Sequence, residues 1–236
     1  MKSLAQTVRC AVLPFGNRKE KSLAHLFNSV VAGDCIEVLR TFPDESIDMV
    51  LTDPPYVAAY RPRDGRTVHN DNNSSWLVPA FRELYRVLRP DSICVTFYGW
   101  PTVDLFFAAF RGAGFRPVSH ISFIKPYSSY TGYTNARHEV AYVLAKGNPR
   151  KPTNPPADVQ QWEYTGNRLH PTQKPVSVLV PLVEAFSKPG DVVLDPFCGS
   201  GSSLVAAASR GRNCIGIEIE SIHAKVAQSR LDGFAV

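Results

Sequence analysis

The chain has 236 residues, of which 44% are hydrophobic and 20% are charged, and its net charge is +5. This composition excludes a disordered or fibrous protein, and the length suits one or two domains of roughly 100–200 residues each. No stretch approaches the roughly 20 consecutive apolar residues that a membrane span needs, and the first ten residues lack the apolar core of a secretory signal, so we expect a cytoplasmic protein without a membrane partner.

Short apolar, β-branched runs alternate along the chain with longer helical patterns, which is typical of an α/β fold with a largely parallel sheet. Strands are expected at 29–33, 47–52, 92–98, 118–124, 139–145, 191–195 and 213–219. Helices are expected at 75–89, 102–112, 175–187, 201–210 and 221–230. We interpret residues 1–24 as a basic, disordered arm and residues 25–236 as one domain.

Charge is distributed unevenly along this domain. The segment 34–53 has six acidic residues and one arginine, which gives −5, whereas 57–89 carries +3 and 111–175 carries +6. The stretches 57–74 and 147–169 are polar and rich in turn residues, and we interpret them as loops of the kind that are usually functional or mobile. An acidic centre flanked by basic loops favours an anionic partner.

Neither the cysteines nor the histidines suggest a metal site. The five cysteines are odd in number and widely spaced, without a CxxC pair, so a disulfide framework and a zinc site are both unsupported. We expect them to be reduced and mostly buried. The six histidines also lack the spacing of metal ligands, so we expect no metal. The cysteines are Cys10, Cys35, Cys94, Cys198 and Cys214.

Residues 191–220 have the pattern of a strand, a turn with two glycines, a helix and a second strand, which together form a nucleotide-binding βαβ unit. Gly199 and Gly201 allow the backbone to turn tightly and to approach a ligand. Glu218 lies at the end of the second strand, where it can bind a ribose diol. The turn is acidic at Asp195 and has no residue suited to phosphate, so it favours a cationic adenosine ligand such as S-adenosylmethionine.

A second motif, Asp53-Pro54-Pro55-Tyr56, directly follows the apolar strand 47–52. Two prolines stiffen the backbone and cannot donate hydrogen bonds, so their carbonyls and the Asp53 carboxylate form a rigid set of acceptors. Tyr56 adds an aromatic face. Acceptors beside an aromatic ring suit the exocyclic amino group of a planar base, although the tetrapeptide alone is equally compatible with a simple turn.

Together the motifs resemble those of the amino-methyltransferases that methylate N6 of adenine or N4 of cytosine in DNA. The resemblance covers about residues 26–230 and includes (D/N/S)PP(Y/F/W) at 53–56, the turn at 195–201 and HPTQKP at 170–175. The catalytic motif precedes the cofactor turn, which matches the circularly permuted β arrangement of this family. The resemblance implies a Rossmann-like fold with about seven mostly parallel strands and helices on both faces.

The resemblance also implies which residues form the site. Asp34 matches the family acid that reaches the adenine amino group of the cofactor. The catalytic residues are expected to be Asp53, Pro54, Pro55 and Tyr56. The residues expected to bind S-adenosyl-L-methionine are Asp34, Cys35, Asp53, His170, Thr172, Gln173, Lys174, Asp195, Phe197, Cys198, Gly199, Ser200, Gly201, Glu218 and Ile219.

The mechanism implied by the family begins with a target base that is flipped out of the duplex. Asp53 accepts one N–H of its amino group, the Pro54 carbonyl accepts the other, and Tyr56 stacks on the base. An aspartate with an ordinary pKa of about 3.9 is too weak a base to deprotonate the amine, so Asp53 orients it and stabilises the developing positive charge. Asp53 also favours adenine, because the cytosine-N4 enzymes of this family commonly carry serine there.

The partner implied by the resemblance is double-stranded DNA, and a homodimer is also expected. Family members place target recognition between the strand near 145 and the motif at 170, which is a small insertion here, at about 146–169. Phosphate contacts carry no sequence information, so we expect a short or relaxed recognition sequence. The expected DNA-binding residues are Arg61, Arg63, Arg66, Lys125, Arg137, Lys151 and Arg168.

Three alternatives remain open. The target can be N4 of cytosine, or the chain can act on RNA or on protein glutamine as an amino-methylase of the same fold. It can also be a catalytically dead relative that only binds DNA. The basic loops and the motif order favour DNA over the other substrates, and the intact motifs argue against a dead enzyme.

Overall fold

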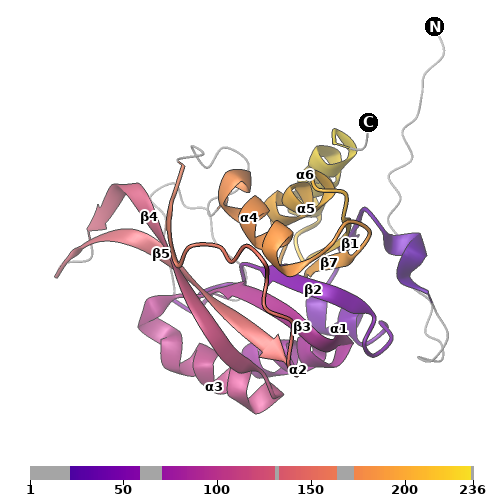
Figure 1. Ribbon diagram of the computed structural model, residues 1–236, viewed down its shortest axis with the longest axis horizontal. Helices are drawn as coiled ribbons and strands as arrows, with labels where there is room; N and C mark the ends of the chain where they lie inside the picture. Colours follow the sequence, from indigo (N-terminus) through magenta and orange to yellow (C-terminus); the bar gives the residue numbers. More distant parts are fainter. Residues whose placement is uncertain (1–21, 59–70, 131–132, 164–172, 235–236) are drawn as a thin grey trace, which may run out of the picture.

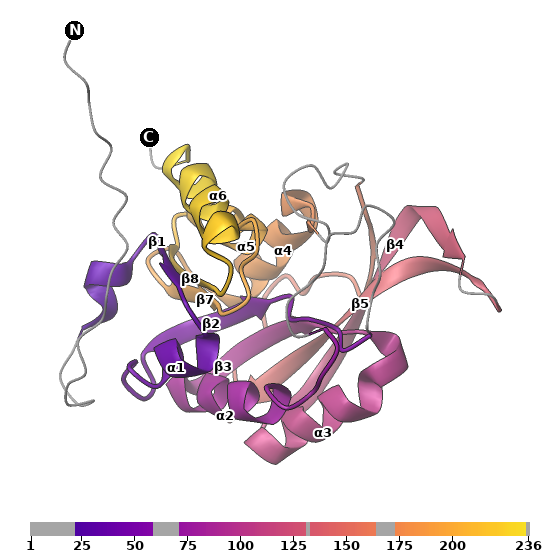
Figure 2. The same cartoon turned by 180° about the vertical axis from the view of Figure 1, so that it is seen from behind.

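The computed structural model describes residues 22–58, 71–130, 133–163 and 173–234. Within them, eight strands form one sheet in the order β1-β8-β7-β2-β3-β5-β4-β6 (Figures 1 and 2). The strands are β1 (Ser29–Ala32), β2 (Ile47–Thr52), β3 (Leu88–Phe97), β4 (Arg116–Tyr130), β5 (Asn135–Lys146), β6 (Val159–Gln161), β7 (Val192–Asp195) and β8 (Asn213–Glu218). Neighbouring strands pair in parallel except that β5 is antiparallel to both β3 and β4.

The sheet separates two apolar cores. One core includes α1, α2 and α3, and the other includes α4, α5 and α6, so that the helices cover both faces (Figure 1). In α2, apolar residues recur every three or four positions and form a single buried stripe. The helices are α1 (Cys35–Leu39), α2 (Leu77–Val87), α3 (Val103–Ala113), α4 (Val176–Phe186), α5 (Ser202–Ala208) and α6 (Ser221–Asp232), with 3-10 turns η1 (Leu23–Leu26) and η2 (Trp100–Thr102).

The direction in which successive strands are added reverses at the centre of the sheet, between the parallel strands β2 and β7. From β2 the chain crosses through α2 to β3 on one side, and from β7 it crosses through α5 to β8 on the other. Because β2 and β7 are adjacent and parallel, their carboxyl ends open a crevice at this switch point. The two sequence motifs follow these two strands.

The seven expected strands and five expected helices are all present, with three differences. An eighth strand, β6, lies in the expected loop 147–169, where three residues, two of them glutamine, give no apolar run. The strands β4 and β5 are longer than expected, because their outer residues are polar and give no apolar pattern. This outer part projects from the body as a hairpin (Figure 1). Helix α1, five residues long, is too short to show a helical period.

The packed part of the chain begins slightly earlier than expected, because Leu23 is buried and belongs to η1 rather than to the arm. The four described cysteines are buried free thiols, in agreement with the sequence analysis, and Cys10 lies outside the described residues. In the described part of the chain, no helix combines the length and apolarity of a membrane span. Nor do three His, Cys, Asp or Glu side chains gather there as they would around a metal.

Candidate active site

The tetrapeptide Asp53-Pro54-Pro55-Tyr56 leaves the carboxyl end of β2 and packs against the turn after β3. The Thr102 hydroxyl donates to the Tyr56 carbonyl at 2.6 Å. A Cβ atom at Gly99 would lie 2.7 Å from the Cβ of Tyr56, so this position requires glycine. The turn that follows the neighbouring strand β3 therefore holds the backbone of the motif at Tyr56.

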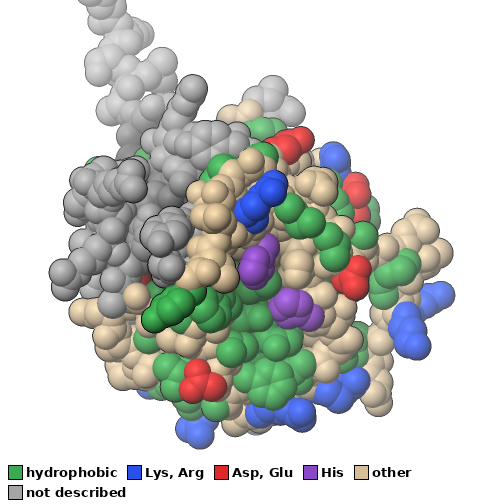
Figure 3. Space-filling model, turned by 90° about the vertical axis from the view of Figure 1, so that its left-hand side faces the viewer, with side chains coloured by type: hydrophobic (Ala, Val, Ile, Leu, Met, Phe, Trp, Pro, Cys, Tyr) green, Lys and Arg blue, Asp and Glu red, His purple; other side chains and the backbone are tan. Residues whose placement is uncertain are grey.

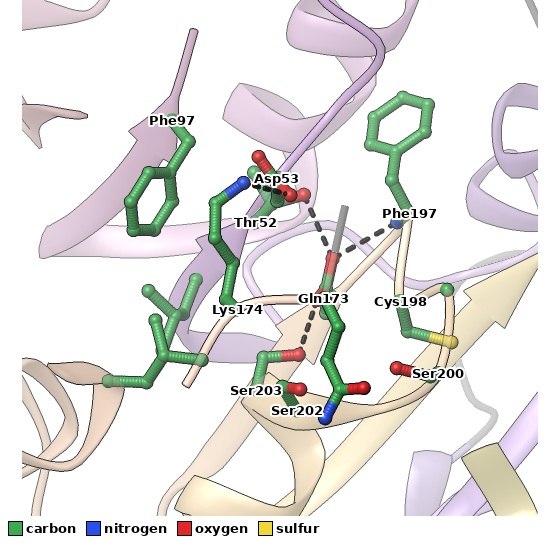
Figure 4. A pocket seen from close by; sticks show the side chains of 14 residues that line it. Thr52, Asp53, Phe97, Gln173, Lys174, Phe197, Cys198, Ser200, Ser202 and Ser203 are labelled. Atoms are coloured by element: carbon green, nitrogen blue, oxygen red, sulfur yellow. Dashed lines mark hydrogen bonds and ion pairs between the residues drawn. The ribbon is translucent and has the colours of Figure 1, made fainter. Parts of the chain in front are cut away.

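Asp53 is a mostly buried carboxylate with a cation bound to it. The Lys174 ammonium donates to Oδ2 at 2.6 Å, and the Tyr56 hydroxyl lies 2.9 Å from Oδ1. The side chains of Asp53 and Lys174 are only 19% and 7% exposed. Figure 4 shows the ammonium turned towards Asp53, with the ring of Phe97 beside it. Burial raises the pKa of Asp53 above its usual value, and Lys174 opposes that rise.

Two strands of the hairpin complete the surroundings of Tyr56. Glu139 on β5 places Oε2 3.1 Å from the Tyr56 hydroxyl, and Lys125 on β4 donates to Glu139 Oε1 at 3.1 Å. Burial by itself would raise the pKa of Glu139, but Lys174 and Lys125 outweigh it, so this pKa is lowered. The side chain of Lys125, expected on a DNA-binding surface, is 9% exposed and is held in this buried ion pair. Buried in this way, Lys125 is not part of an exposed DNA-binding surface.

Asp195, the last residue of β7, ties the second motif to the first. Its Oδ1 accepts from the Thr52 hydroxyl at 2.9 Å and from the Phe197 amide at 3.1 Å, and Ser203 of α5 donates to Oδ2. Burial raises the pKa of Asp195 to about 7, although these three donors favour the ionised form. Asp195 thus connects β2, β7 and α5, and it lines the pocket described below.

Residues of β8 and α6 shape the glycine turn. Gly199 donates its backbone N–H to Glu218 Oε2 at 2.9 Å. Gly201 has φ +82°, and a Cβ there would lie 3.0 Å from the Cβ of Ala227 on α6. The Arg230 guanidinium donates to the Ser200 carbonyl at 2.6 Å. The turn therefore depends on two glycines and on partners about 20 to 30 residues later.

A pocket of about 430 Å³, part of it open to solvent, joins the two motifs at the switch point (Figure 4). Acidic, hydroxyl and apolar groups line it, and the cation among its described lining residues, Lys174, is bound to Asp53. The described lining residues include no arginine, and these acidic, hydroxyl and apolar groups fit a cationic adenosine ligand better than a phosphate. The lining residues are Leu51, Thr52, Asp53, Phe97, Gln173, Lys174, Leu179, Asp195, Phe197, Cys198, Gly199, Ser200, Ser202 and Ser203.

The other residues expected at the cofactor site lie at the ends of neighbouring strands. Asp34 follows β1 and caps α1, accepting from the Ile36 amide at 2.8 Å. Cys35 is buried, and burial raises the pKa of its thiol to about 12. Ile219 is exposed directly after β8. His170 and Thr172 lie outside the described residues.

Of the expected DNA-binding residues, the structure describes three. Arg137 and Lys151 are exposed, whereas Lys125 is buried. Within the expected recognition insertion, Trp162 is also buried and its ring lies 6.1 Å from that of Phe123. The four arginines outside the described residues are Arg61, Arg63, Arg66 and Arg168.

Sequence reasoning missed several residues that act on the motifs from elsewhere in the chain. Glu139 carried a usable signal, because it is the only acidic residue between 105 and 157. Thr52, Phe97, Ser203 and Arg230 carried none, since nothing local distinguishes them from ordinary strand and helix residues.

Comparison with known proteins gives consistent results. The family model of the N6/N4 DNA methylases matches residues 47–229. YubD from Escherichia coli (strain K12), named as a methylase, is 51% identical over 85% of this chain and 88% of its own length. The DNA adenine methyltransferase YhdJ from the same organism is 28% identical, over 94% of this chain and 86% of its own length.

Two solved structures resemble the fold. TTHA0409 from Thermus thermophilus, described as a DNA modification methylase in complex with S-adenosyl-L-methionine, has a TM-score of 0.68 and 27% identity, covering 87% of this chain and 93% of its own. The cytosine-N4-specific PvuII DNA methyltransferase has a TM-score of 0.72 and 17% identity, covering 88% and 89%, and shows likeness of fold alone. The family match spans most of the sequence and both motifs, and the chain belongs to the N6/N4 DNA methylase family.

Proposed function

We propose that this chain transfers a methyl group from S-adenosylmethionine to the exocyclic N6 of adenine in double-stranded DNA. The observation that carries the proposal is that one pocket holds the acceptor Asp53 beside the glycine turn at 195–201. A methyl donor held by the turn and a target amine held by Asp53 would then lie in the same pocket, with no protein atoms between them.

The turn and its neighbours would hold the cofactor. Each oxygen of Glu218 accepts one backbone N–H and retains a lone pair for a ribose hydroxyl. Asp34 and Ile219 follow the adjacent strands β1 and β8, where the adenine would lie. When bound, S-adenosylmethionine supplies an electrophilic methyl group on a positively charged sulfur, which suits the acidic lining of the pocket.

Asp53 would orient the target amine. Each carboxylate oxygen can accept two hydrogen bonds, so Asp53 keeps capacity for an incoming N–H beside its contacts with Lys174 and Tyr56. Lys174 opposes the rise in the pKa of Asp53 that burial causes, which favours the charged acceptor. A charged acceptor stabilises the positive charge that grows on the amine as it attacks.

Two exposed basic residues, Arg137 and Lys151, support a DNA substrate. Arg137 precedes Glu139 by two residues on β5, so both side chains point to the same face of the strand, where Tyr56 lies. Figure 3 shows the end of the molecule that carries the hairpin, where Lys and Arg side chains, with Asp and Glu among them, lie around and on a face with hydrophobic and histidine side chains. We place the phosphates near the pocket against Arg137, and Lys151, beyond the other end of β5, stays a predicted DNA contact.

The choice of base rests on Asp53 and on the relative YhdJ, which is named an adenine enzyme. The fold does not discriminate, because a cytosine-N4 enzyme shares it. A small recognition surface also agrees with the buried state of Trp162 and Lys146 within the insertion, and we keep the expectation of a short or relaxed recognition sequence. The homodimer likewise remains a prediction.

Methyl transfer from labelled cofactor tests the proposal directly. Purified protein is incubated with duplex DNA, with RNA of the same sequence and with a protein acceptor, and the modified nucleosides are separated. We expect label in N6-methyladenine from the duplex. Label in N4-methylcytosine would overturn the adenine assignment, and label only in RNA or protein would overturn the DNA assignment.

A further inference from the structure

The hydroxyl of Tyr56 is surrounded by charged groups. It lies 2.9 Å from Asp53 Oδ1 and 3.1 Å from Glu139 Oε2, and Lys174 donates to it at 3.1 Å. A phenol has one proton to donate, so Asp53 and Glu139 compete for it. The carboxylate that accepts this hydrogen bond has one lone pair fewer for another donor.

The pair formed by Lys125 and Glu139 lies behind this hydroxyl. Lys125 is almost completely buried, donates to Glu139 Oε1 and stacks 5.4 Å from the ring centre of Tyr127. Burying two opposite charges is costly and, compared with apolar side chains, often brings no gain in stability. The contact between Glu139 and Tyr56 offers a different reason for the pair, because it leads directly to the catalytic motif.

We propose that Glu139 and Lys125 are positioning residues for Tyr56: the buried pair draws the Tyr56 hydroxyl proton away from Asp53 and fixes the ring against which the target base stacks. This inference rests on the proposed function. Lys174 and Lys125 keep Glu139 ionised, Lys125 aims it at the hydroxyl, and Tyr56 donates to Glu139. Asp53 Oδ1 then keeps its lone pairs for the N–H of the target amine.

A double-mutant cycle separates this role from a merely structural one. In Glu139→Gln the side chain is a weaker acceptor, and its amide can donate to the Tyr56 hydroxyl. The hydroxyl then donates its own hydrogen bond to Asp53. We expect kcat to fall about tenfold, with the KM for the cofactor changed less than twofold. In a Tyr56→Phe background the same change should lower kcat less than twofold. Equal losses in both backgrounds would overturn the proposal.

The role of Lys125 is tested with a matched control at an exposed lysine outside the hairpin. Lys125→Met should lower kcat in parallel with Glu139→Gln, while Lys188→Met, which removes an exposed charge before β7, should not. Salt dependence of DNA binding provides the opposing readout. If Lys125 contacts a phosphate, its loss reduces the slope of log K against log salt by about one, and this result would overturn the positioning role.

Two further measurements distinguish a loss of activity caused by misfolding from one caused by a changed environment of Tyr56. The double variant Lys125→Met with Glu139→Gln removes both charges and should stay folded if a single substitution does not. In protein labelled with 13C on the tyrosine ring, the Tyr56 signal is assigned by its loss in Tyr56→Phe. It should shift in Glu139→Gln and Lys125→Met but not in Lys188→Met. An unmoved signal overturns the inference even if methyl transfer is confirmed, and a moved signal supports it even if the substrate assignment fails.

Discussion

Lys174 is the cation bound to Asp53, the carboxylate on which the proposed chemistry depends. Its Nζ lies 2.6 Å from Asp53 and 5.9 Å from the ring centre of Trp162. Among the described residues, Tyr56, Glu139 and Asp195 are further titratable groups around Asp53. Asp53 is active as an anion in the proposed mechanism, so its ionisation links Lys174 to the rate.

Lys174→Met should shift the pH dependence of methyl transfer. A neighbouring cation lowers the pKa of a carboxyl by about 1–3 units, so its removal lets burial raise the pKa of Asp53 further. The acidic limb of the kcat profile then moves to higher pH by at least about one unit, and activity returns as the pH rises. Lys174→Arg, which keeps the charge, should move it much less. An unchanged profile in Lys174→Met would contradict this role.

Asp195 should make the folded protein less stable as the pH rises. Its pKa is about 7 in the folded protein, against about 3.9 in the unfolded chain. Below about pH 4 both states are protonated, and between about pH 4 and 7 the unfolded chain loses the proton first. The free energy of unfolding therefore falls across this interval, by up to about 4 kcal/mol.

Asp195→Asn isolates that contribution, because the amide keeps an acceptor for Thr52 and Phe197 and cannot titrate. Denaturant unfolding at a series of pH values measures it. The difference in stability between the two proteins should change between about pH 4 and 7 and level off outside that window. A constant difference across the range would show that Asp195 is ionised throughout in the folded state.

The residues that the sequence identified are those in contiguous motifs, because composition and order within a few residues define their chemistry. Asp53 and Gly199 are examples, and both line the pocket. The partnership of Lys125 with Glu139 needs the pairing of β4 with β5, which the linear sequence does not specify. The basic and aromatic stretch around Lys125 therefore predicts a DNA contact, whereas its burial is visible only in the folded chain.

Among the larger elements, the turn between β7 and α5 depends most on backbone conformation. Gly201 combines a positive φ with a close neighbour on α6. A side chain in the left-handed region costs roughly 1–2 kcal/mol, and Ala227 adds a steric contact. Gly201→Ala should therefore destabilise the protein by about 1–3 kcal/mol and weaken binding of S-adenosylmethionine, as measured by thermal denaturation and calorimetry.

Two other glycines serve as controls for that substitution. Gly190 also has a positive φ, +88°, but open space around a Cβ, so Gly190→Ala isolates the backbone strain. Gly112 lies inside α3 with open space and no positive φ, so Gly112→Ala should stabilise the protein by roughly 0.5–1 kcal/mol. If Gly201→Ala leaves cofactor binding as strong as Gly190→Ala does, the turn is not part of the cofactor site.

The elements of the central sheet were predictable because β2 and β7 are buried and appear in the sequence as apolar runs. The hairpin ends and β6 were not, since polar residues there pair through the backbone without an apolar pattern. Helix α1 depends on the Asp34 cap, whereas the sequence predicts only a cofactor contact for Asp34. Local pattern therefore specified the elements that are packed on both faces and missed those at the periphery.

For the whole molecule, charge is the property that follows most directly from composition. Residues 1–21 hold five basic residues and one acid, so they contribute +4 of the net +5. Deleting them should reduce the slope of log K against log salt for DNA binding without changing which base is methylated. Fluorescence anisotropy over a series of salt concentrations measures the slope. A changed methylated base would show that the segment takes part in recognition instead.

The most direct test of adenine methylation by the pocket at the switch point is sequencing that detects modified bases, applied to DNA from cells that express the protein. Cells that express Asp53→Ala provide the matched control, since loss of a charged hydrogen bond of roughly 1.5–3 kcal/mol should slow transfer at least about tenfold to a hundredfold. We predict N6-methyladenine within a short sequence in the first DNA and strong depletion of it in the second. N4-methylcytosine, or equal methylation in both, would contradict the account.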